Sequence, residues 1–159
     1  QNPTEQSGTF LLPESQMDRF FMRIHLGYPP EKAERELLLG RDRRHILQEL
    51  KPVMNTELLI ERQQRIASIT ASEALIDYIQ RIIAYTRSYN GFKDGLSPRG
   101  GMALLKAARG WAMIEGRSHV LPDDVQAVLP SVMEHRLGGS SKSEHYPLST
   151  LVLREVNVI

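Results

Sequence analysis

The chain of 159 residues contains no cysteine. It therefore has no disulfide, no thiolate zinc ligand and no cysteine nucleophile. It also lacks a run of about 18 consecutive apolar residues, the length that a membrane span needs. Neither sign of charge dominates, because 20 Lys+Arg against 19 Asp+Glu leave a formal net charge of +1. This balance does not indicate a general nucleic-acid binder.

The motifs of a complete active site are missing as well. A phosphate-binding loop of the form GxxxxGK[ST] is absent: Gly95 and Gly100 have the right separation, but Gly101 stands where the lysine belongs. No hydrophobic run ends in Asp-Glu, and neither HExxH nor GxSxG occurs. The five histidines show no recognised ligand spacing, so we expect no metal site.

What is present predicts a mostly helical chain with one strand. The segment Arg19–Leu26 is short, apolar and bounded by Gly27 and Pro29, which is typical of a buried strand. A lone strand would leave its backbone polar groups without partners. Together with a first residue, Gln1, that is not Met, this indicates a piece of a longer protein.

Helical periodicity and start signals predict five helices. Thr70-x-x-Glu73 reads as a capping box, Ser97 as a cap before Pro98, and Pro130 as a kink or an end. Trp111 and the methionines are expected in core or near-core packing, and Leu148–Ile159 fits a helix or a strand equally. The helices are expected from Pro30 to near Gly40, from Asn55 or Thr56 to about Ser68, from Thr70 through Thr86, from Ser97 toward Gly116, and from Pro122.

Four ordered sequence blocks resemble the MoxR family of AAA+ ATPases. They are the opening Gln1-Asn2-Pro3 with Leu12-Pro13-Glu14-x-Gln16-x-Asp18-Arg19-Phe20, then Gly95-Leu96-Ser97-Pro98-Arg99-Gly100, then Gly116-Arg117 with Pro122-x-Asp124, and His135-Arg136-Leu137. Leu121 departs from the family's usual capping Thr, so we expect a weaker helix start there.

The resemblance implies a mainly α fold, a helical AAA+ lid subdomain preceded by a loop and one orphan strand of the α/β ATPase core. Residues 1–28 would be the remnant of that core, from sensor 1 to the arginine-finger strand. Residues 29–159 would be the lid subdomain with a C-terminal tail. The Walker A and Walker B motifs would lie upstream of Gln1.

Three residues match the functional positions of the family. Asn2 matches sensor 1, which orients the attacking water, although an Asn-Pro dipeptide also forms simple turns. Arg19 matches the arginine finger; the alternative is a surface arginine paired with Asp18, which we expect to orient Arg19 or support a subunit interface. Arg99 matches sensor 2, which contacts the nucleotide; otherwise it and Lys106, on the same helix face, form a solvated basic face.

By the same resemblance, the whole protein would be an ATP hydrolase that uses ATP and Mg²⁺. It would act as a cytoplasmic homo-oligomer, in a hexameric ring, and drive chaperone-like remodelling or maturation of protein complexes. Its partners would be von Willebrand factor A domain proteins and client complexes, with no nucleic acid expected. The 159-residue chain alone is expected to be inactive.

Two other functions fit the sequence. The first is a non-catalytic helical protein-interaction module with the sequence shape of an ATPase lid. The second is a nucleic-acid binder that uses the window from residue 96 to residue 121, where four basic residues face one acidic residue. Such a binder would lose affinity steeply as salt rises.

Overall fold

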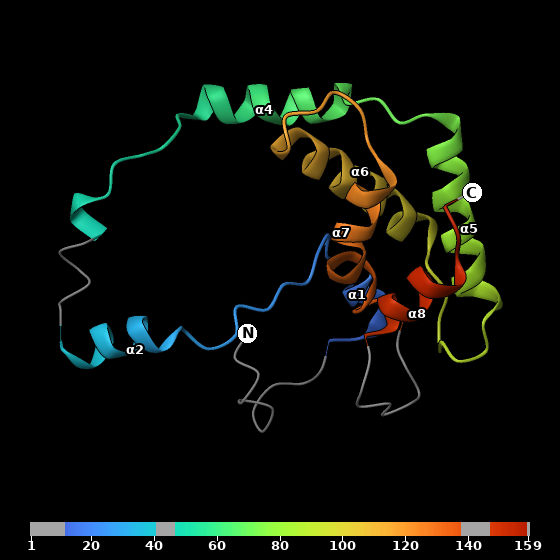
Figure 1. Cartoon of the computed structure of the whole chain (residues 1–159), viewed down its shortest axis with the longest axis horizontal. Helices are drawn as coiled ribbons and strands as arrows, with labels where there is room; N and C mark the ends of the chain where they lie inside the picture. Colours follow the sequence, from blue (N-terminus) through green and yellow to red (C-terminus); the bar gives the residue numbers. More distant parts are fainter. Residues whose placement is uncertain (1–11, 41–46, 138–146, 159) are drawn as a thin grey trace. The chain divides into compact units, whose positions relative to one another are not determined.

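The fold is mainly helical, as predicted (Figure 1). A computed structural model describes residues 12–40, 47–137 and 147–158. These residues divide into two units. The larger unit joins residues up to Arg23 with those from Ile66 onward, and the smaller unit is Ile24–Arg65.

Four helices build the core of the larger unit: α5 (Glu73–Ser88), α6 (Pro98–Ile114), α7 (Pro122–Met133) and α8 (Leu148–Glu155). Helix α6 packs most extensively on α7. Its buried face is rich in alanine, whose small side chain lets the two helices approach closely. The fully buried core side chains include Ile82, Leu104, Ala108, Ala112, Val125, Leu129, Val132 and Val152.

The start of α6 was predicted correctly, whereas the predicted capping box at the start of α5 was wrong. Ser97 accepts a hydrogen bond from the Gly100 backbone N–H at 3.0 Å, with Pro98 in the first turn. Helix α5 is capped by Ser72 instead, whose Oγ accepts from Leu75 N–H at 3.2 Å. Thr70 is unavailable because its backbone pairs with the segment around His119.

Helix α7 forms although two features of its sequence predict a weak helix. Its first residue follows Leu121, which has no capping side chain, but the Asp124 carboxylate accepts from the Leu121 N–H at 2.7 Å. Pro130 does not end the helix, which continues to Met133. Two residues close to Pro130, Leu129 and Val132, are fully buried, and this packing offsets the loss of one backbone hydrogen bond.

Helix α8 resolves the segment that the sequence left unassigned. The carboxylate of Glu134 accepts from the backbone N–H groups of Leu148 at 3.2 Å and Ser149 at 2.8 Å. The first turn of α8 is therefore capped by a residue that lies at the end of α7.

The predicted strand Arg19–Leu26 is wrong. The described residues form no strand; a short helix, α1 (Glu14–Met17), leads through a turn into extended chain. The Arg23 N–H donates to the Ser131 carbonyl at 2.8 Å, and one such bond does not make a ladder. The segment is not buried either, since Leu26 is 93% exposed.

The smaller unit holds α2 (Glu31–Leu38) and most of α4 (Thr56–Ser68), both close to their predicted bounds. Neither helix has a buried residue. Large apolar side chains stand exposed here, among them Leu38, Leu39, Leu50 and Val53. In the part of the chain that the structure describes, no helix has the length and apolar character to cross a membrane.

The core assignment predicts a contrast within α6. Leu104 is fully buried and Met102 is 67% exposed, although both are large apolar residues of one helix. We expect Leu104→Ala to lower the free energy of unfolding by about 2–5 kcal/mol through the cavity it leaves. Met102→Ala should change it by less than about 0.5 kcal/mol. Urea unfolding of both variants checks this, and equal losses would contradict the core assignment.

Candidate functional site

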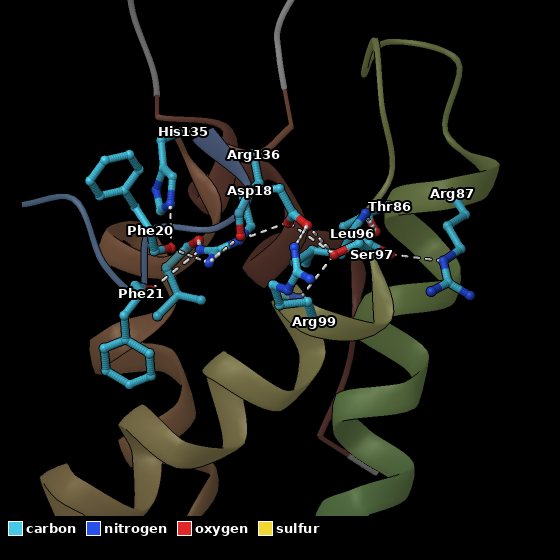
Figure 2. Close-up of polar contacts among 12 residues, drawn as sticks. Asp18, Phe20, Phe21, Thr86, Arg87, Leu96, Ser97, Arg99, His135 and Arg136 are labelled. Carbon is cyan, nitrogen blue, oxygen red and sulfur yellow. Dashed lines mark hydrogen bonds and ion pairs between the residues drawn. The ribbon is translucent and has the colours of Figure 1, made fainter. Parts of the chain in front are cut away.

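The carboxylate of Asp18 forms the centre of a polar cluster between the turn after α1 and the start of α6 (Figure 2). Its two oxygens accept from Ser97 Oγ at 2.9 and 3.0 Å. Arg136 Nε donates to one of them at 3.2 Å, and Arg99 pairs with the other at 3.7 Å. Three side chains therefore hold one carboxylate.

Ser97 links this carboxylate to the first turn of α6. Its Oγ accepts from the Gly100 N–H and donates its own proton to Asp18. The carboxylate thus lies at the N-terminus of α6, where the helix dipole favours negative charge. The anion at the N-terminus of α6, the helix that carries Arg99, is therefore the Asp18 carboxylate.

Arg136 is the buried cation of the cluster, with a side chain only 2% exposed. Besides the Asp18 carboxylate, its guanidinium donates to the backbone carbonyls of Asp18 at 3.3 Å, of Phe21 at 3.4 Å, and of Phe20 and Val132. Burial lowers the pKa of Arg136, and the charge of Asp18 acts in the opposite direction. The planar fork of an arginine suits such a divided set of acceptors.

The loop before Ser97 is fixed to the end of α5. Arg87 Nε donates to the Leu96 carbonyl at 2.9 Å, and the Leu96 N–H donates to Thr86 Oγ1 at 3.0 Å. A Cβ atom at Gly95 would lie 2.8 Å from the Arg87 Cα, so only glycine fits without displacing the backbone. The position of Ser97 is therefore set by α5 as well as by α6.

The predicted site residues fall into three groups. Arg99 joins the cluster, and its side chain stays 54% exposed. Arg19 is exposed beside Asp18, whose carboxylate pairs with Arg99 and Arg136. Asn2 lies outside the described residues. Lys106 places its ammonium group 5.9 Å from the centre of the Phe21 ring. The roles predicted for Asn2, Arg19 and Arg99 remain predictions.

Sequence reasoning gave Arg136 and His135 no role, although the block His135-Arg136-Leu137 was among those that carried the resemblance. The match of this block to the family was the one feature of the sequence that could have pointed to these two residues. The expected core or near-core packing holds for Met133, which is fully buried, but not for Met102, which is 67% exposed, and Trp111 is 41% exposed.

A second ion pair lies at the other end of α6 and has a separate role. Arg117 donates to both oxygens of Asp124 at 2.6 Å. Burial would raise the pKa of Asp124, but Arg117 and the Leu121 N–H outweigh it and hold the pKa below its ordinary value. A helix of 17 residues is about 25 Å long, so this pair is remote from Asp18. Among the described residues, no group of three His, Asp or Glu side chains could hold a metal ion.

The comparisons with known proteins agree with the sequence blocks. Residues 84–153 match the AAA lid domain family. The chain is similar to Chaperone MoxR1 of Mycobacterium tuberculosis, with 37% identity over 86% of this chain and 38% of that protein. It is also 34% identical to Protein MoxR of Methylorubrum extorquens, over 86% of this chain and 45% of that protein.

A solved structure is similar in fold as well as in sequence. The crystal structure of a candidate ATPase from Cytophaga hutchinsonii superposes with a TM-score of 0.83 and 30% identity, over 99% of this chain and 52% of that one. The chain matches the lid-containing region of MoxR-family AAA+ ATPases. It spans less than half of the length of these two MoxR relatives. The larger unit contains the residues that match the AAA lid domain family.

His135 is a buried titratable side chain of the larger unit. Its side chain is buried, and Nε2 lies 3.3 Å from the Phe20 carbonyl. Because a carbonyl only accepts, the neutral ring must carry its proton on Nε2. Burial, and then the charge of Arg136, lower the pKa of His135 below its ordinary 6.5.

We therefore expect stability to fall with pH in a defined window. Below pH 6.5 the unfolded chain protonates His135 while the folded chain does not, so stability is lost as pH drops from 6.5 to the folded pKa. The free energy of unfolding in urea should fall as the pH drops below about 6.5, and His135→Gln should flatten this dependence. An unchanged dependence in the variant would contradict the assignment.

Proposed function

We propose that this chain is the lid-bearing part of a ring-forming ATPase that couples MgATP hydrolysis to chaperone-like remodelling or maturation of protein complexes. The observation that carries the proposal is the Asp18 cluster: Asp18 pairs with Arg99 and directly precedes Arg19 in the chain. The names of its relatives, a MoxR chaperone and a candidate ATPase, support it.

Two exposed arginines, each next to Asp18 through the chain or through an ion pair, suit phosphoryl transfer. In that reaction negative charge spreads over the oxygens of the transferring phosphoryl group, and catalysis is almost entirely positioning and electrostatic stabilisation. A guanidinium is permanently charged and binds phosphate oxygens through two parallel N–H groups. Arg19 and Arg99 are both exposed, as such a contact requires.

The Asp18 cluster also bears on which subunit's nucleotide Arg19 and Arg99 would contact. Asp18 is adjacent to Arg19 in sequence and paired with Arg99 in space. On this proposal, Arg19 and Arg99 would serve one phosphate site. If Arg19 is the finger that enters the neighbouring subunit's site, Arg99 acts on that same neighbour's nucleotide.

The remaining parts of the proposal follow from the family. ATP and Mg²⁺ would bind residues outside this sequence, which contains no phosphate-binding loop. Asn2 would act as sensor 1 and orient the attacking water. A homo-oligomeric ring, von Willebrand factor A domain proteins as partners, protein complexes as clients and a cytoplasmic location complete the expectation.

The smaller unit favours a second candidate, a helical protein-interaction module. Its apolar side chains are exposed, with Leu38 at 83% and Val53 at 95%. Such a module would bind a partner tightly as the chain alone and would be indifferent to Arg99→Ala. An ATPase lid would show its function only in the full-length protein.

The proposal predicts the effect of removing each arginine from the full-length protein. Arg19→Ala should lower ATP turnover by about 10³-fold or more and leave nucleotide binding largely intact. Arg99→Ala should also lower turnover. Arg154→Ala is the matched control, because this lid arginine is 82% exposed and far along the chain from the cluster. Wild-type turnover of the Arg19→Ala protein would contradict the proposal.

Mixing the two variants tests which subunit each arginine serves. If both act on the neighbour's nucleotide, every site in a mixed ring lacks one arginine, so turnover stays low. If Arg99 acted within its own subunit, some sites would contain both arginines. Recovery of turnover on mixing would therefore contradict the shared site.

A further inference from the structure

Arg136 holds the backbone on both sides of Arg19. Its guanidinium donates to the carbonyl of Asp18, which precedes Arg19, and to the carbonyls of Phe20 and Phe21, which follow it. The Arg19 backbone is thereby fixed at both ends, while its side chain stays exposed. The direction in which Arg19 leaves the surface thus depends on a residue 117 positions later in the chain.

The same guanidinium acts on Arg99 through Asp18. Arg136 Nε holds one carboxylate oxygen at 3.2 Å, and the other oxygen pairs with Arg99. Ser97 fixes the carboxylate to the first turn of α6. One buried side chain therefore sets the backbone of Arg19 and the ion-pair partner of Arg99.

Stability alone is a poor reason for this arrangement. Removing two charges from water costs several kcal/mol per ion, and apolar replacements of buried ion pairs are often neutral or stabilising. Arg136 is 2% exposed on its side chain, and Asp18 is 26% exposed. What an apolar pair could not supply is a donor fork that reaches several carbonyls and a carboxylate at once.

We propose that Arg136 is a positioning residue for ATP hydrolysis, which holds Arg19 and Arg99 in one fixed geometry without touching the nucleotide. The inference rests on the proposed function. Lysine at this position would keep the charge but lose the planar fork, so it would leave some of the carbonyls around Arg19 without a donor.

The test compares Arg136→Lys with Arg117→Lys in the full-length protein. Both substitutions weaken an arginine–aspartate pair within the larger unit, but the pair of Arg117 with Asp124 is at the opposite end of α6. We expect Arg136→Lys to lower kcat about 100-fold, the cost of misplacing catalytic groups by about 1 Å. KM for ATP should change much less than kcat, because the phosphate-binding loop expected outside this sequence would supply most of the nucleotide-binding contacts. Arg117→Lys should lower stability and leave kcat within about threefold.

Equal kcat values for the two lysine variants would overturn the proposal, because both would then report only a loss of stability. If Arg136→Lys fails to fold, Asp18→Asn replaces it, since that side chain is partly exposed and keeps its shape. Asp18→Asn should also lower kcat with little change in KM, and wild-type kcat in this variant would overturn the proposal.

Arg19→Ala, measured in the same protein, separates the positioning role from the proposed function. Loss of turnover in Arg19→Ala with normal kcat in Arg136→Lys would reject the positioning role alone. Normal turnover in Arg19→Ala would reject the proposed function and the positioning role with it. Loss in both, with Arg117→Lys close to wild type, is the expected result.

Discussion

The guanidinium of Arg136 meets the carboxylate of Asp18 in a largely buried position, and the geometry around Arg19 and Arg99 depends on this contact. A buried cation needs a paired anion and fully used donors. Asp18 supplies the anion, and the carbonyls of Asp18, Phe20, Phe21 and Val132 take the remaining donors. The hydrogen bonds of Arg136 therefore hold the segment after α1 against the end of α7 and the start of α6.

The helical core makes this contact possible. Helix α6 presents an alanine-rich face to α7, so the start of α6 and the end of α7 lie close together. Ser97 and Arg136 occupy these two ends and meet at Asp18. Gly95 and the bonds from Thr86 and Arg87 fix the approach from α5. The packing of the helices therefore sets the positions of the side chains that meet at Asp18.

Local signals in the sequence predicted the helices, the Ser97 cap and the family. They failed where a distant residue decided the outcome. Helix α5 is capped by Ser72 and not by the predicted Thr70, because Thr70 pairs with residues around His119. The first turn of α8 is capped by the carboxylate of Glu134, at the end of α7. The expected strand has a single backbone bond to Ser131. Asp18 was expected to orient Arg19 or support an interface, but its pairing with Arg136 spans 118 positions and leaves no local pattern.

The most direct test of the role of Arg136 is a distance measurement across the Asp18 contact. The chain has no cysteine, so Gln16→Cys and Met102→Cys, both at exposed positions, would carry spin labels at these sites alone. We expect one narrow distance distribution between α1 and α6 in the otherwise unchanged chain and in Arg117→Lys, and a broad one in Arg136→Lys. A distribution that stays narrow in Arg136→Lys, or is already broad without it, would contradict the claim that this arginine holds the two arginine-bearing segments together.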